Sequence, residues 1–117
     1  MATKRQTEIA KALRRLTPMI PFNEAEEVKQ LARQRHLRAL PVSVAVWLSL
    51  VAHVRHVHTD YDQLMDEGYD RDAARHFVMD EINAVLESWQ ATRLLDGSET
   101  EENLPDPVES DDQGPQA

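Results

Sequence analysis

The stretch PVSVAVWLSLVAHVRHVHTDYDQLMDE, residues 41–67, is the most apolar long segment of the 117-residue chain and decides its fold. Apolar side chains recur there at spacings of three and four residues, which is the period of a helix with one buried side. This stripe comprises Trp47, Leu50, Val54, Val57, Tyr61 and Leu64. The pattern predicts one long helix over residues 41–67, with Gly68 suited to the C-terminal cap.

A second stripe adjoins the first on the same predicted helix. It begins with Val44, Leu48 and Val51 and turns polar from Arg55 onward. A helix that is apolar on two adjoining stripes is buried over a wide face. We therefore expect the first half of this helix to lie at the centre of the protein. Because β-branched residues are mediocre helix formers, a strand over residues 42–46 is the competing interpretation.

Two helical segments are expected upstream of the central one. Residues 5–16 form a short amphipathic helix that ends before two prolines. Its apolar face comprises Ile9, Leu13 and Leu16. Residues 23–39 follow, and Asn23 stands three residues before Glu26, the spacing of a capping box.

One helical segment is expected downstream, over residues 70–89, with Asp70 as its N-cap. Its inward side chains are expected to be Ala74, Phe77, Val78, Ile82, Val85, Leu86 and Trp89. The short connection predicts that this helix folds back on the central helix. The sequence thus indicates an all-α bundle of three to four helices, with the long central helix hairpinned to the last helix.

The composition excludes several classes of protein. The chain has no cysteine, so it can form neither a disulfide framework nor a thiolate metal site. Its three glycines are too few and too scattered for a phosphate-binding loop. The N-terminus lacks an apolar signal region, and the longest apolar stretch, residues 42–54, is shorter than the roughly 20 residues of a membrane span. We expect a cytoplasmic protein with no cofactor and no membrane contact.

Charge is divided unevenly along the chain, whose net charge is −8. Residues 1–59 hold ten basic and four acidic side chains, whereas residues 60–117 hold three basic and seventeen acidic ones. The segment 96–117 has too few apolar groups to offset the entropy of ordering it. We therefore divide the chain into a basic amphipathic N-terminal helix (1–16), a helical domain (17–95) and a disordered acidic tail (96–117).

A polar edge follows the apolar half of the central helix. It comprises Arg55, His56, His58, Thr59, Tyr61 and Asp62, with Arg75 of the last helix placed to meet it across the hairpin. One interpretation is an internal network in which Asp62 pairs with an arginine, because partly buried charges must be paired. The other is an anion-binding edge in which Arg55, Arg75 and His58 hold a phosphate or carboxylate. The sequence leaves both interpretations open.

A metal site is a second hypothesis for the same helix. At 100° per residue, His53, His56 and Asp60 share one side of it, and imidazole and carboxylate groups bind first-row metals. Such a cluster could also serve a metal-dependent or acid–base enzyme. The pattern is not a zinc-protease motif, since no glutamate stands at the position of the general base. Two histidines on an exposed helical face are more often a solvated surface.

The basic N-terminal half raises the alternative of nucleic-acid binding, with Arg33, Arg35 and Arg38 as phosphate contacts. Against it, no aromatic residue interleaves with these charges to stack on bases. A helix–turn–helix is excluded because its recognition helix would be the most apolar segment of the chain.

Residues 46–89 also resemble a known family, domain of unknown function 2293. The resemblance rests on Trp47, the Arg55–His56 pair, Thr59, Tyr61, Asp62, Leu64, the Ala74–Arg75 pair and the tryptophan near the end of the last helix. Residues 16–35 look like the upstream region of that family, so the resemblance covers roughly residues 17–90. The resemblance implies no activity, but it puts Arg55, His56, Thr59, Tyr61, Asp62 and Arg75 at the positions of the family's motif. It thereby favours the polar edge over the side that carries His53 and Asp60.

From these observations we expect a non-enzymatic binding or adaptor module that acts on a protein partner or on a second copy of itself. Nucleic-acid association is the second hypothesis, and a metal-dependent or acid–base enzyme is the third. A tryptophan exposed in a surface patch, Trp47 or Trp89, would support the adaptor hypothesis.

Overall fold

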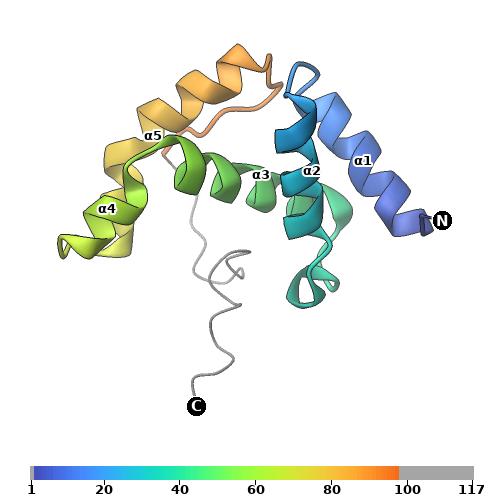
Figure 1. Ribbon diagram of the computed structural model, residues 1–117, viewed down its shortest axis with the longest axis horizontal. Coiled ribbons are helices and arrows are strands. Elements are labelled where there is room, and N and C mark those ends of the chain that lie inside the picture. Colours follow the sequence, from blue (N-terminus) through green and yellow to red (C-terminus); the bar gives the residue numbers. More distant parts are fainter. Residues whose placement is uncertain (1, 98–117) are drawn as a thin grey trace.

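The computed structural model describes residues 2–97, and every regular element in that range is a helix (Figure 1). In chain order these are α1 (Lys4–Leu16), α2 (Phe22–Ala32), the short 3-10 helix η1 (Arg35–Leu37), α3 (Val42–His58), α4 (Tyr61–Asp66) and α5 (Arg71–Ser88). The expected all-α class is confirmed, and the alternative of a strand over residues 42–46 is wrong. The expected acidic tail lies, from residue 98 onward, outside the described residues.

Helix α3 is the centre of the fold, and it contacts α1, α2, α4 and α5. Every residue from Ala45 to Arg55 is buried, as a helix that is apolar on two adjoining stripes requires. The long apolar segment is therefore the core around which the other helices pack, as its pattern predicts.

Helix α1 packs on this core, which the sequence alone did not establish. A capping box joins Thr3 and Gln6 at its start, and its apolar face buries Ile9 and Leu13. At the same end, Nη2 of Arg5 donates hydrogen bonds to the carbonyl oxygens of Leu37 and Leu40, at 3.2 and 2.9 Å. These bonds hold the turn around η1 beside the N-terminus of α1.

Helix α2 is shorter than the sequence predicts. It begins after Pro21, whose extended backbone precedes the first turn, so Asn23 lies inside that turn and the expected capping box does not form. The helix ends at Ala32 rather than at residue 39, because the extended conformation of Gln34 interrupts it before η1.

Helix α3 also ends earlier than predicted, at His58 rather than near residue 67. Thr59 is extended (φ −132°, ψ 175°), and its hydroxyl donates to the carbonyl of Arg55 while accepting a hydrogen bond from the N–H of Tyr61. Helix α4 therefore starts in a new direction. Gly68 follows its C-terminus with φ of 103°, so the predicted capping role of this glycine is confirmed.

Helix α5 begins as predicted, since Asp70 accepts a hydrogen bond from the N–H of Ala73 at 2.8 Å. The helix runs back past α4 and packs on α3, which is the expected hairpin (Figure 1). Of its predicted inward residues, Phe77 is instead exposed. No helix within residues 2–97 has the length and apolar character needed to cross a membrane.

Candidate functional site

The predicted polar edge lies at the turn between α3 and α4, and most of its residues meet there. The buried guanidinium of Arg55 lies over the ring of Tyr61, 5.3 Å from its centroid. His56 packs its ring edge-to-face on Tyr61, and its Nδ1 lies 2.6 Å from Oδ1 of Asp62. Arg75 is partly buried on α5, which packs on α4. These contacts join residues of the turn to one another and favour the interpretation of an internal network.

The predicted metal set of His53, His56 and Asp60 is not brought together. His53 is buried against α2, His56 contacts Asp62, and Asp60 lies beyond the end of α3. The prediction assumed one continuous exposed helical face. It fails because the helix ends at His58 and because His53 faces a neighbouring helix.

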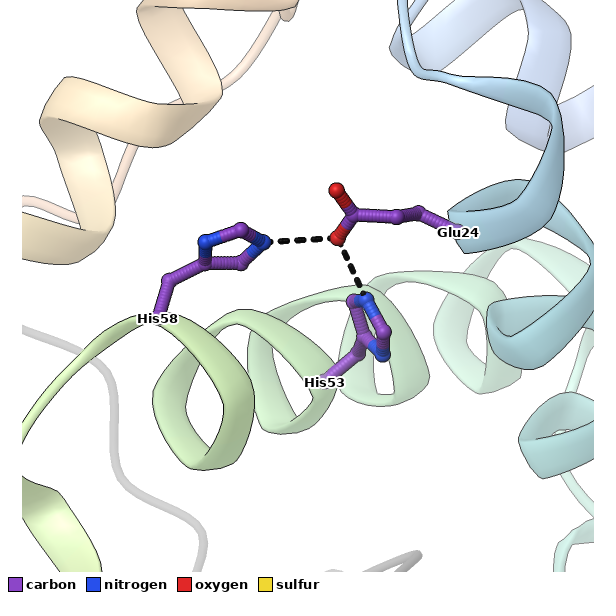
Figure 2. Close-up of side chains that lie close together, drawn as sticks. All are labelled: Glu24, His53 and His58. Carbon is purple, nitrogen blue, oxygen red and sulfur yellow. Dashed lines mark hydrogen bonds and ion pairs between the residues drawn. The ribbon is translucent and has the colours of Figure 1, made fainter.

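A different cluster forms between α2 and α3, from Glu24, His53 and His58 (Figure 2). The Nε2 atom of His53 lies 2.8 Å from Oε1 of Glu24, and the Nε2 atom of His58 lies 2.6 Å from the same oxygen. The potential ligand atoms of the three side chains all lie within 4.8 Å of one another. Within residues 2–97 this is the one group of three or more histidine and acidic side chains arranged in this way.

The two helices position these side chains by their ends. Glu24 stands in the first turn of α2, where the helix dipole favours a negative charge. His58 is the last residue of α3, where the dipole favours a proton donor. His53 lies five residues earlier on α3 and points to α2, so the contact between α2 and α3 closes the cluster.

The surroundings of the cluster hold both imidazole rings in place. Nδ1 of His53 lies 3.6 Å from Oε1 of Glu27, on the side of the ring away from Glu24. The ring of His58 stands edge-on to Trp89, with centroids 5.7 Å apart. The side chain of His53 is only 3% exposed, whereas that of His58 is 30% exposed. The cluster is thus anchored inside and open to solvent at His58.

The hydrogen bonds of the cluster show which of its atoms carry protons. A carboxylate only accepts, so each imidazole donates its Nε2–H to Glu24. Burial raises the pKa of the Glu24 carboxyl, but the hydrogen bonds and attraction from His58 and His53 outweigh burial and leave that pKa below its ordinary value of 4.5. Glu24 is therefore ionised at neutral pH.

This lowered pKa predicts how metal-free protein responds to acid. The ionised carboxylate stabilises the fold above its unfolded-state pKa, and that contribution is lost as the pH falls through the lower folded-state pKa. We expect the difference in unfolding free energy between the native chain and Glu24→Gln to be largest near neutral pH and to shrink below pH 4.5. Urea denaturation in the presence of a chelator, across that pH range, measures it. The matched control is Glu81→Gln, which removes an exposed carboxylate of α5 outside the cluster.

The other predicted positions lie on the surface or in the core. Arg33, Arg35 and Arg38 are all exposed, as the nucleic-acid hypothesis requires. Trp47 and Trp89 are both buried, so neither supplies the exposed patch that would have supported an adaptor. Glu24 was not predicted as a site residue, and the local signal for it is an acidic side chain in the first turn of a helix.

Comparison with known proteins places the chain in a family but not in a functional class. No curated protein and no solved structure shows a significant match. The model of the family DUF2293, described as an uncharacterized conserved protein, matches residues 12–90, which include α2 to α5, the cluster of Glu24, His53 and His58, and the polar edge. The resemblance seen in the sequence is confirmed: the chain belongs to the DUF2293 family.

Proposed function

We propose that this domain is a binding module that holds one divalent transition-metal ion, with Zn²⁺ as the best fit, between Glu24, His53 and His58. The observation that carries the proposal is the convergence of two imidazole nitrogens on one carboxylate oxygen, at 2.8 and 2.6 Å. Two nitrogens and one oxygen make a donor set that Zn²⁺ uses widely in proteins.

The distances fit an ion with modest movement of the side chains. Zn²⁺ binds nitrogen and carboxylate oxygen at about 2.0–2.2 Å, so two ligand atoms of a tetrahedral site stand roughly 3.3 Å apart. Each contact between Glu24 and a histidine would therefore open by less than about 1 Å. The ion would take the place of the two Nε2 protons that now lie between these atoms, and each neutral imidazole would then carry its proton on Nδ1.

The second ring nitrogen of His53 supports the same proposal. Histidines that bind a metal through one ring nitrogen usually donate the other N–H to a carboxylate or carbonyl, which fixes the orientation of the ring. Glu27 lies 3.6 Å from Nδ1 of His53, close enough to take that role after a small approach.

Three protein ligands leave a fourth position on the ion. In metal sites of this type the open position takes water or an external ligand. The partial exposure of His58 gives such a ligand a route from solvent. A side chain or carboxylate of a partner bound there would make the domain a metal-dependent binding module, which is the form of the adaptor hypothesis that the cluster supports.

The alternative is that the three side chains form only a hydrogen-bonded link between α2 and α3. The two hypotheses differ in their response to metal. A hydrogen-bonded link gains nothing from Zn²⁺, whereas a metal site binds it with a stoichiometry of one and is stabilised by it.

Isothermal titration of metal-free protein with Zn²⁺ tests the proposal. We expect saturable binding of one ion per chain. In His58→Ala the affinity should fall by more than about 100-fold, because removing a metal ligand costs more affinity than removing a residue that only hydrogen-bonds to a ligand. The matched control is His76→Ala, which removes an exposed histidine of α5 and should bind as the native chain does. Circular dichroism checks that both variants are folded. The proposal fails if the native chain shows no saturable binding, or if folded His58→Ala binds equally well.

A further inference from the structure

A groove between α1 and α2 combines an exposed aromatic ring with basic side chains. It encloses about 290 Å³, and its walls include Arg14 and Pro18 from α1 and the following turn, and Phe22 and Lys29 from α2. Phe22 is the most exposed large apolar side chain within residues 2–97, at 79%. The ring of Phe22 is therefore open to solvent and available to a ligand in this groove.

The α2 wall of this groove continues into the basic residues singled out in the sequence. Phe22, Lys29 and Arg33 are seven and eleven residues apart, so they lie on one side of the helix. At 1.5 Å per residue they span roughly 16 Å. Lys29 is engaged by Glu26 at 2.6 Å, whereas Arg33 is exposed at the end of the helix and Arg14 is exposed across the groove.

This arrangement corrects the objection that no aromatic residue accompanies the basic charges. The sequence separates Phe22 from the neighbouring cations, but the packing of α1 on α2 places it with Arg14 and Lys29 in one groove. A ring that stacks on bases, flanked by arginines that bind phosphates, is how proteins hold single-stranded nucleic acid.

The charge around the groove favours a polyanion over an apolar helix or peptide. Residues 2–41, which form α1, α2 and η1, carry nine lysines and arginines and four acidic residues. Apolar side chains also line this groove, but Leu13 is buried and Phe22 is the large one that stands exposed in it. The charged side chains of the groove are Arg14, Lys29 and Glu26, and the last two are paired with each other. A base can reach that ring only when it is unstacked, which favours a single strand over a duplex.

We propose that the groove between α1 and α2 binds single-stranded nucleic acid, with a base stacked on Phe22 and the flanking phosphates held by Arg14 and Arg33. This site is separate from the cluster of Glu24, His53 and His58, and the proposal does not depend on metal binding.

Fluorescence anisotropy of the full chain with labelled oligouridylate and oligothymidylate of about 12 nucleotides tests it. At low salt we expect saturable binding that weakens as salt is raised. Phe22→Ala should bind about tenfold more weakly, and Phe22→Trp should bind as well as the native chain. Replacing both Arg14 and Arg33 by glutamine should reduce the slope of log affinity against log salt by about 1.4.

The matched control is Phe77→Ala, which removes an exposed phenylalanine from α5 and should leave affinity unchanged. Because Phe22 and Phe77 are both exposed, neither substitution opens a cavity, and thermal unfolding checks this. No saturable binding at low salt overturns the proposal. Equal binding by folded Phe22→Ala, or equal binding of a duplex of the same length, also overturns it, since attraction to phosphates alone would then explain the affinity. Competition by polyglutamate as strong as by oligouridylate would show a general polyanion surface instead.

Discussion

Replacing Leu50 by alanine is expected to lower the free energy of unfolding by about 2–5 kcal/mol, which is the usual cost of a large-to-small change in a packed core. Replacing Val57 by alanine, on the same helix, should change it by less than about 0.5 kcal/mol. Leu50 is fully buried in α3, where α1, α2 and α5 surround the helix. Val57 is 57% exposed one residue before the helix ends, so its removal leaves no cavity.

Urea denaturation followed by circular dichroism measures both changes. The comparison is informative because the apolar stripe of the sequence treats Leu50 and Val57 as equivalent. Two similar losses of stability would mean that α3 continues past His58 as the stripe predicts and that Val57 is buried against another helix. A large loss for Leu50 alone supports the early end of the helix.

Apolar periodicity was sufficient to predict the core but not the ends of the helices. The central segment is buried because no exposed helix could present two adjoining apolar stripes to water. Two local signals with a direct backbone role also held, since Asp70 caps α5 through its carboxylate and Gly68 takes the positive φ that ends α4, whereas the capping box expected at Asn23 did not form. Each of these signals depends only on residues that are close together in the sequence, so it can be recognised without knowing how the helices pack.

The break at Thr59 could not be predicted in this way. Neither Thr59 nor Asp60 is a strong helix breaker, and the apolar spacing continues through Tyr61 and Leu64. The helix ends there because the Thr59 hydroxyl takes over two backbone hydrogen bonds. It donates to the Arg55 carbonyl and accepts a hydrogen bond from the Tyr61 N–H. This local alternative to the helical ladder is the known reason that threonine favours helix ends.

The candidate site of Glu24, His53 and His58 could not be predicted from apolar periodicity for a different reason. Helical spacing compares residues within one element, and so it grouped His53 with Asp60, a neighbour in sequence. The carboxylate that His53 and His58 share belongs to Glu24, which is 29 and 34 residues away and reaches them only because α2 packs on α3. Phe22 joins Arg14 in the groove through the same kind of contact, between α1 and α2. A site whose residues lie on two helices can be identified only once the packing of those helices is known.

Trp89→Ala is expected to lower the free energy of unfolding by about 3–5 kcal/mol, the range for removing a buried tryptophan. Trp89 caps the C-terminus of α5 and is only 6% exposed within the core to which all five α-helices contribute. Its ring also supports the edge of His58, and its carbonyl accepts a hydrogen bond from the N–H of Met19 at 3.1 Å. The side chain therefore closes the end of the bundle at which the turn before α2, the end of α3 and the end of α5 meet.

Trp89→Phe separates the loss of volume from the loss of an aromatic partner for His58. It retains a ring in the core, so we expect less than half of the destabilisation that alanine causes, because the cost of a core substitution grows with the cavity it leaves. Urea denaturation compares the two variants, and Trp47 remains in both as a fluorescent probe, since the chain has two tryptophans. A loss below about 1 kcal/mol for Trp89→Ala would contradict the burial of this ring, because truncating an exposed side chain costs no more than that. A large loss of unfolding free energy in Trp89→Ala, most of it restored in Trp89→Phe, would show that an aromatic ring at this position holds the end of α5 against the end of α3 beside His58.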